Sequence, residues 1–259
     1  MKKALLVIAI AFGSQAAFAQ SSGENDVKNL RFGLVATPML TWYKPEGKNL
    51  ESNGVSAKIG GGLDMEIRLN DVACISTGFN INFYGGKLNL LDTAYYFLSK
   101  DGEFVKKADT TSTSVAYQLN SRVYKGTYVS LPFTMKLKTP QIGALTYFGQ
   151  FGINSSVRWK GFADDAVTAV ATNGKASQTK LNNAKDMALF GFQLDLGAGA
   201  EWNMAGSTSM VFGLNYYSGF SNILKSDSEY LFRTPSNSAA AFKQTAHANA
   251  FALTVGFLF

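Results

Sequence analysis

Charged residues, histidine and cysteine are all scarce in this chain. Asp, Glu, Lys and Arg make up 16% of its 259 residues, and there is one histidine, His247, and one cysteine, Cys74. One residue of each kind nearly excludes a zinc site of the usual type, rules out an internal disulfide and weakens the case for a His- or Cys-based enzyme. We therefore predict no cofactor, no metal site and no enzymatic activity.

Other absences narrow the class of protein further. Soluble domains carry about a quarter charged residues, so this chain has fewer charges than the surface of a soluble protein normally has. Its 46% apolar and 13% aromatic content is too high for a disordered chain. Beyond the first twenty residues or so, no apolar run approaches the roughly 18 residues of a membrane helix. No basic stripe with interleaved aromatics is present either, so we predict no nucleic-acid partner.

The first residues have the layout of a secretory signal peptide. Met1-Lys2-Lys3 is basic, residues 4–12 are apolar, and Ala17-Phe18-Ala19 supplies small residues for cleavage. We predict a signal peptide at 1–19 and a polar periplasmic lead at 20–29. An uncleaved membrane anchor is the alternative, but the apolar stretch is too short for it.

The rest of the chain alternates between apolar and polar residues. In the segment 55–68 every second residue is apolar or glycine and all the charges fall on the opposite face, as in a strand and not a helix. The same pattern predicts eight strands, at 30–43, 55–68, 72–84, 127–138, 145–159, 187–203, 208–220 and 249–259. Short turns alternate with long connections at 44–54, 85–126, 160–186 and 221–248.

This order predicts an all-β fold, an eight-stranded antiparallel up-and-down transmembrane β-barrel over residues 30–259, with both ends at the short-turn side. Short periplasmic turns and long outer loops are typical of the outer membrane. A soluble barrel with an apolar interior is the alternative. The apolar register of the strands carries no charge, and a Lys or Arg facing lipid at the midplane costs about 2–4 kcal/mol. The polar register holds ten charges, too few for a solvated surface, so we predict that the apolar register faces lipid.

Aromatic residues gather at both ends of the predicted strands. Those near the long connections are Trp42, Tyr43, Phe83, Tyr84, Trp159, Tyr216, Tyr217 and Phe220, and those near the short turns are Trp202, Tyr147, Phe257 and Phe259. Two such girdles suit the two membrane–water interfaces.

The charges on the inward register need partners, because buried charges are paired in proteins. Ten charged residues fall on the inward register. For nine of them we predict an ion-pair network that plugs the lumen: Lys58, Asp64, Glu66, Arg68, Lys136, Lys138, Arg158, Asp195 and Glu201. The tenth is Arg31. The alternative is an ion pathway, for which eight strands leave little room.

The end of the chain and several internal segments resemble a known family. Asn249–Phe259 is an alternating strand with a terminal Phe259, which resembles the assembly signal of outer-membrane barrels and implies the barrel-assembly machinery as a partner. Residues 128–138, 143–152, 197–202 and 207–220 resemble the PorT-like outer-membrane β-barrel family of Bacteroidetes. The resemblance implies a barrel, and the family's namesake is implicated in secretion, although no motif here carries that role.

The long connections carry the remaining specificity. Lys100-Asp101-Gly102, between Tyr95–Leu98 and Phe104–Val105, predicts an outward hairpin. We predict a structural or binding role, in which the loops 85–126, 160–186 and 221–248 contact a surface ligand or an envelope protein and rest against outer-membrane lipid and lipopolysaccharide. A small porin-like channel is the second hypothesis. The third is a hydrolase at the rim, with His247, Asp227, Glu229 and loop serines.

Overall fold

The computed structural model describes residues 29–106, 109–110, 114–206, 208–234 and 241–259. The predicted signal peptide at 1–19 lies outside these residues, as does the predicted lead except Asn29. Among the described residues no helix is both long and apolar enough to cross a bilayer.

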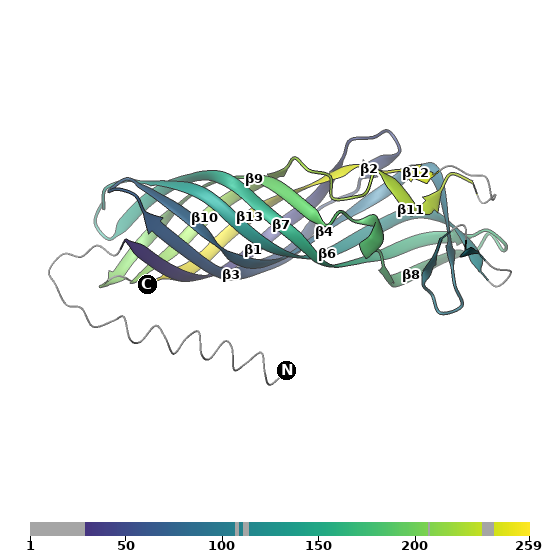
Figure 1. Ribbon diagram of the computed structural model, residues 1–259, viewed down its shortest axis with the longest axis horizontal. Helices are drawn as coiled ribbons and strands as arrows, with labels where there is room; N and C mark the ends of the chain where they lie inside the picture. The colour runs from purple at the N-terminus through teal and green to yellow at the C-terminus, as the bar shows by residue number, and fades with distance from the viewer. Residues whose placement is uncertain (1–28, 107–108, 111–113, 207, 235–240) are drawn as a thin grey trace.

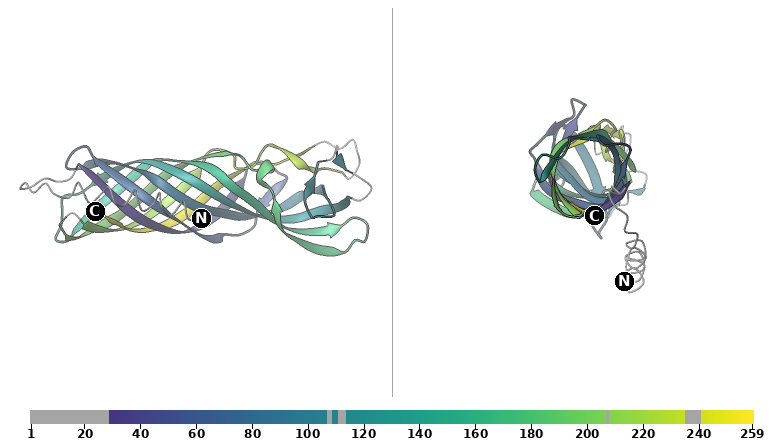
Figure 2. Two further views of the ribbon diagram at one scale, coloured as in Figure 1. Left: turned by 60° about the horizontal axis from the view of Figure 1, so that its bottom comes forward. Right: turned by 90° about the vertical axis from the view of Figure 1, so that its left-hand side faces the viewer.

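Eight strands form a closed ring in which each pairs antiparallel with the neighbouring ring strands along the chain (Figure 1; Figure 2 shows the ring end-on). They are β1 (Leu30–Pro45), β3 (Ser56–Arg68), β4 (Ala73–Leu98), β6 (Val115–Lys138), β7 (Leu145–Ala169), β9 (Phe190–Ala205), β10 (Thr208–Gly219) and β13 (Ala246–Leu258). The last strand pairs with the first and closes the ring. The eight-stranded up-and-down barrel is therefore confirmed, with the short turns, the start of β1 and the C-terminus at one end.

The outside of the ring is apolar. Large apolar side chains are exposed all around it: Leu34, Leu40, Ile59, Leu63, Phe79, Leu131, Phe133, Phe151, Ile153, Leu194, Leu196, Phe212, Leu214, Leu253 and Phe257. The alternate positions are polar and buried inside: Thr37, Ser76, Asn82, Thr134, Asn154, Gln193 and Asn215. A soluble barrel would have the opposite arrangement, so the predicted orientation of the two registers is confirmed.

Three strands are much longer than predicted. β4, β6 and β7 have 26, 24 and 25 residues, whereas a membrane crossing needs about 9–11. Much of the predicted loops 85–126 and 160–186 is therefore paired strand, because the alternation and the ladder of hydrogen bonds continue past the apolar band. The ring remains eight-stranded because these extensions project outward (Figure 1).

The outer extensions carry additional short elements. These are β2 (Leu50–Ser52), β5 (Phe104–Val105), β8 (Lys175–Asn182), the 3-10 helix η3 (Ala184–Asp186), β11 (Asp227–Phe232) and β12 (Ala241–Lys243). The predicted hairpin is present, since β4 pairs with β5 around a turn in which Gly102 has a φ of 76°. We call the described residues of 46–54, 85–126, 160–189 and 221–248 the outer lobe.

The predicted outer girdle is partly wrong. Successive side chains of a strand point to opposite faces, so in the pair Trp42–Tyr43 only one residue can face lipid. Trp42 stacks on Tyr216 with ring centroids 6.4 Å apart, whereas Tyr43 is buried inside the barrel. For the same reason Tyr84 and Tyr217 point into the lumen. Trp159, Phe83 and Phe220 remain outside, where they are exposed.

The apolar band can be tested by placing the same charge at two depths of β6. Leu131 lies near the middle of the band and Leu137 near the short-turn end, and both side chains are exposed. We expect Leu131→Arg to lower the free energy of unfolding in lipid vesicles by about 2–4 kcal/mol and Leu137→Arg by about 0–1 kcal/mol, because the cost depends on depth. Equal losses in denaturant titrations would contradict the assignment of the band.

Candidate functional site

An ion-pair cluster lies inside the lumen at its short-turn end. Glu66 on β3 accepts hydrogen bonds from Arg31 at 2.5 Å, from Lys138 at 2.7 Å and from Lys136. Glu201 on β9 binds Arg31 at 2.8 Å and Lys138 at 2.5 Å. Glu66, Lys136 and Glu201 are buried. The cluster joins β1, β3, β6 and β9 across the lumen.

Four of the nine residues predicted for a lumen network lie in this cluster: Glu66, Lys136, Lys138 and Glu201. Arg31 binds both carboxylates. The sequence placed it on the inward register, but our predicted network left it out. The available signal in the sequence was an inward-facing arginine at the start of the first strand, and the structure adds the register that sets Arg31 opposite Glu66.

The other five predicted residues lie elsewhere. Arg68 pairs with Asp71 in the turn at 2.7 Å. Lys58 and Arg158 have no acidic partner among the described residues, and Arg158 donates to the Ala188 carbonyl at 3.2 Å. Lys58 lies near the outer end of β3 and Arg158 near the middle of the long strand β7. Both are several residues from the cluster, and each residue of a strand adds about 3.3 Å.

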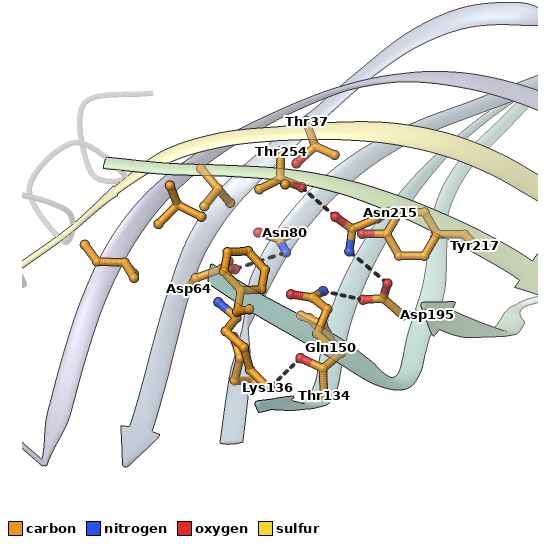
Figure 3. Close-up of a pocket in the computed structure, with 17 residues that line it drawn as sticks. Thr37, Asp64, Asn80, Thr134, Lys136, Gln150, Asp195, Asn215, Tyr217 and Thr254 are labelled. Carbon is orange, nitrogen blue, oxygen red and sulfur yellow. Dashed lines mark hydrogen bonds between the residues drawn. The ribbon is translucent and has the colours of Figure 1, made fainter. Parts of the chain in front are cut away.

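Asp64 and Asp195 are held by amides instead of cations. Figure 3 shows both at a small cavity in the middle of the lumen. Asp195 accepts hydrogen bonds from Gln150 at 3.2 Å and Asn215 at 2.9 Å, and Asn80 approaches Asp64 at 3.5 Å. The lumen therefore uses two ways of satisfying its carboxylates, namely ion pairs at the end and amide donors in the middle.

The cavity is too small for a solute. Its volume of about 50 Å³ holds a few waters, since one water needs about 10–15 Å³ of such space, whereas ligand pockets reach about 300–1,000 Å³. Phe148, Val211 and Leu258, which are among the residues that line it, form an apolar layer, and Lys136 Nζ lies 4.6 Å from the Phe148 ring.

A layer of tyrosines fills the outer end of the lumen. Tyr84 donates to Gln193 at 2.9 Å and packs edge-on against Tyr128 with ring centroids 5.6 Å apart. Tyr43 and Tyr124 pack at 6.0 Å. All four side chains are buried. The sequence placed Tyr128 inside but counted Tyr43 and Tyr84 in the girdle, so this layer was not predicted.

The outer lobe has a buried ion pair of its own. Arg122 on β6 donates to both carboxylate oxygens of Asp165 on β7, at 2.7 and 2.6 Å, and both side chains are 0% exposed. The Arg122 guanidinium also lies 5.1–5.8 Å from the ring centroids of Tyr96, Phe104 and Tyr124. Burial alone would lower the pKa of Arg122, but the Asp165 carboxylate outweighs it and holds that pKa above its ordinary value.

A second buried carboxylate ties η3 to β11. Asp186 accepts hydrogen bonds from the Ser228 hydroxyl and, at 2.7 Å, from the Glu229 N–H, and burial raises its pKa. Between the two anchors lies an apolar core that includes Leu88, Leu119, Val167, Leu224, Leu231 and Phe242. The outer lobe is thus a packed structure and not a set of loose loops.

His247 is not part of a Ser–His–acid arrangement within the described residues. Its Nε2 lies 2.7 Å from Glu46 and its Nδ1 lies 3.0 Å from the Ser221 carbonyl oxygen. Asp227 is exposed, and Glu229 pairs with Lys225. In the described part of the chain no three His, Cys, Asp or Glu side chains come close enough together to hold a metal ion.

Comparisons with known proteins agree with this architecture. Residues 18–225 match the family described as outer membrane protein beta-barrel domain. No curated protein matches the sequence.

Several solved barrels are similar at low identity. Neisserial surface protein A is 7% identical with a TM-score of 0.40, covering 89% of this chain and 96% of that one. Ail of Yersinia pestis is 11% identical with a TM-score of 0.35, covering 90% and 100%. OprG of Pseudomonas aeruginosa is 12% identical with a TM-score of 0.41, covering 89% and 94%. At this level of similarity none of them indicates a function for this chain.

The ion-pair cluster can be tested with two matched variants. Glu66 binds three cations and Glu201 binds two, and removing one partner of a buried ion pair costs about 3–5 kcal/mol. We expect Glu66→Gln to lower the free energy of unfolding by about that amount and Glu201→Gln to lower it less. Denaturant titration in vesicles measures both losses, and the reverse order would contradict the assigned cluster.

The Arg122–Asp165 pair can be tested by removing its charges singly and together. Arg122→Met leaves Asp165 buried without its partner, whereas Arg122→Met with Asp165→Leu leaves no buried charge. We expect the single variant to expose the outer lobe to protease in vesicle-embedded protein and the double variant to restore most of the protection. The barrel should keep its boiling-dependent gel mobility in both. Equal cleavage of the wild type and the single variant would show that the pair does not hold the lobe.

Proposed function

The chain belongs to the outer membrane protein β-barrel domain family, and from that premise we propose that it is a membrane anchor for the outer lobe. In this proposal the lobe binds a surface ligand or another protein of the envelope. The observation that carries the proposal is the packed core of the lobe, fixed by the fully buried Arg122–Asp165 pair. A binding surface that is ordered in advance loses less conformational entropy on association.

The continuity between barrel and lobe supports this role. β4, β6 and β7 pass from the apolar band into the lobe without a break, so the membrane anchor and the proposed binding surface share one sheet. The outer parts of β4, β6 and β7 continue well past the membrane, and a membrane anchor alone does not need strands of this length.

A transport channel is the less favoured hypothesis. The ion-pair cluster, the apolar residues around Phe148 and the tyrosine layer fill much of the lumen, and the cavity among them holds only a few waters. The proposal also assigns no catalysis to the rim, since both ring nitrogens of His247 face partners other than a serine hydroxyl.

Two more specific versions of this proposal follow from the sequence. In one the chain is a PorT-like barrel, and in the other it is an accessory protein of an envelope or secretion complex. The segments that carry the PorT-like resemblance lie mainly on β6, β7, β9 and β10, in the part of these strands that builds the barrel and not the lobe. Phe259 exchanges backbone hydrogen bonds with Phe32 at 2.8 and 3.1 Å and leaves its ring exposed. That exposure is compatible with recognition of the terminal residue by the barrel-assembly machinery.

Site-specific photo-crosslinking in intact cells tests the proposed role. A photoreactive residue at Lys100 in the hairpin, Ser177 on β8 or Lys243 on β12 should give adducts of defined mass, because all three side chains are exposed on the lobe. The matched control at Pro140, in a short turn, should not give the same adduct. Arg122→Met should abolish the lobe adducts while the barrel stays folded. Absence of adducts at every lobe position would contradict a binding role.

A further inference from the structure

An amphiphilic patch lies on the outer surface where β7 leaves the apolar band. Trp159 is 62% exposed, and Leu189 and Phe190, just before and at the start of β9, are 49% and 58% exposed. Two exposed lysines, Lys160 on β7 and Lys185 in η3, accompany these apolar side chains. The patch thus combines apolar surface continuous with the lipid-facing band and positive charge directly above it.

Close backbone contact brings the two lysines into one neighbourhood. The Asn183 N–H donates to the Gly161 carbonyl at 3.1 Å, and a Cβ on Gly161 would lie 3.2 Å from the Ala184 Cα and 2.7 Å from the Met187 Sδ. The glycine thus lets η3 pack closely against β7. Lys160 and Lys185 are each one residue from this contact, so the two lysines are neighbours on the outer surface.

The second contact places the apolar residues beside the lysines. The Arg158 N–H donates to the Leu189 carbonyl at 2.8 Å, which fixes the link before β9 alongside Trp159. The Lys160 Nζ lies 5.6 Å from the centroid of the Trp159 ring, so this lysine lies against the aromatic that marks the membrane interface.

The charge of these two lysines is not neutralised by the described residues. Neither Lys160 nor Lys185 forms an ion pair with any of them. The nearby acids are already engaged: Asp164 binds Lys125 and accepts the Lys180 N–H at 2.9 Å, and Asp186 is buried against Ser228. The patch therefore presents two unpaired cations at the level of the outer leaflet's head groups.

We infer that this patch binds a phosphate-bearing lipid of the outer leaflet. Lys160 and Lys185 hold the phosphate, and the acyl chains lie on Trp159 and Phe190. Basic residues near a membrane surface attract anionic head groups, and aromatic side chains suit the interface. A lipid is favoured over a free anion because the exposed apolar residues of the patch continue into the band that faces the acyl chains.

Native mass spectrometry of the folded full-length chain in detergent tests the inference. The probes are bisphosphorylated lipid A, the same lipid without its phosphates, and inorganic phosphate as a competitor. We expect Lys160→Gln/Lys185→Gln to weaken lipid A binding about 30-fold, from the usual contribution of a lysine near a charged surface. The control Lys48→Gln/Lys100→Gln removes two exposed lysines of the lobe away from the patch and should change binding less than threefold.

Three results would overturn the inference. Equal weakening by both double variants would indicate diffuse attraction to the whole protein. Equally tight binding of the dephosphorylated lipid would remove the role of the phosphate. Displacement of lipid A by millimolar inorganic phosphate would indicate a site for a free anion. Because all four substitutions are on exposed side chains, boiling-dependent gel mobility should be unchanged and serves as the folding control.

Discussion

Closure of the sheet is the constraint on which the rest of this structure depends. A bilayer core offers no hydrogen-bond partner to an exposed backbone N–H or carbonyl, so the first and last strands must pair. β1 and β13 do so along eleven residue pairs from Gly33–Leu258 to Pro45–Ala246. With eight strands the ring is narrow, and its interior is only wide enough to be filled by side chains. A filled lumen follows from the number of strands.

The side chains that fill the lumen are arranged so that buried charged and polar groups have partners. Charges inside need partners, and here Glu66 and Glu201 are surrounded by three cations at one end. In the middle, amides take that role for Asp195. At the outer end tyrosine rings replace charge, with Tyr84 bonded to Gln193 and Tyr124 to Gln244. Beyond the membrane the same strands continue, and Arg122 with Asp165 repeats the paired-charge solution inside a lobe whose apolar core is continuous with the tyrosine layer of the lumen.

The membrane part of the fold could be predicted because it depends on local alternation. Every second residue of a strand faces lipid, so the segment 55–68 alone separated its two faces, and all eight ring strands were located. The outer lobe could not be predicted in the same way. Arg122 and Asp165 lie 43 positions apart, and nothing in either neighbourhood indicates that the two meet. The segments there also resemble loops in composition, although Val115, Tyr117 and Leu119 continue the alternation.

The side-chain contacts inside the lumen could be predicted in part. The register showed which charges point inward, but partners also depend on depth, and Lys58 and Arg158 sit too far along their strands to reach Glu66 or Glu201. Assigning Tyr43 and Tyr84 to the girdle overlooked the fact that each follows an aromatic that already faces lipid. Pairing of neighbouring positions across strands, such as Arg31 with Glu66, is information that the topology adds to the sequence.

The central claim is that the barrel anchors a lobe and has no path through it. Single-channel recording of the purified full-length protein in planar bilayers tests this most directly. We predict no steady conductance, because ion pairs and apolar side chains fill one part of the lumen and tyrosines fill its outer end. Long-lived open channels of uniform size in protein that shows a boiling-dependent gel shift would contradict the claim and make transport the leading hypothesis.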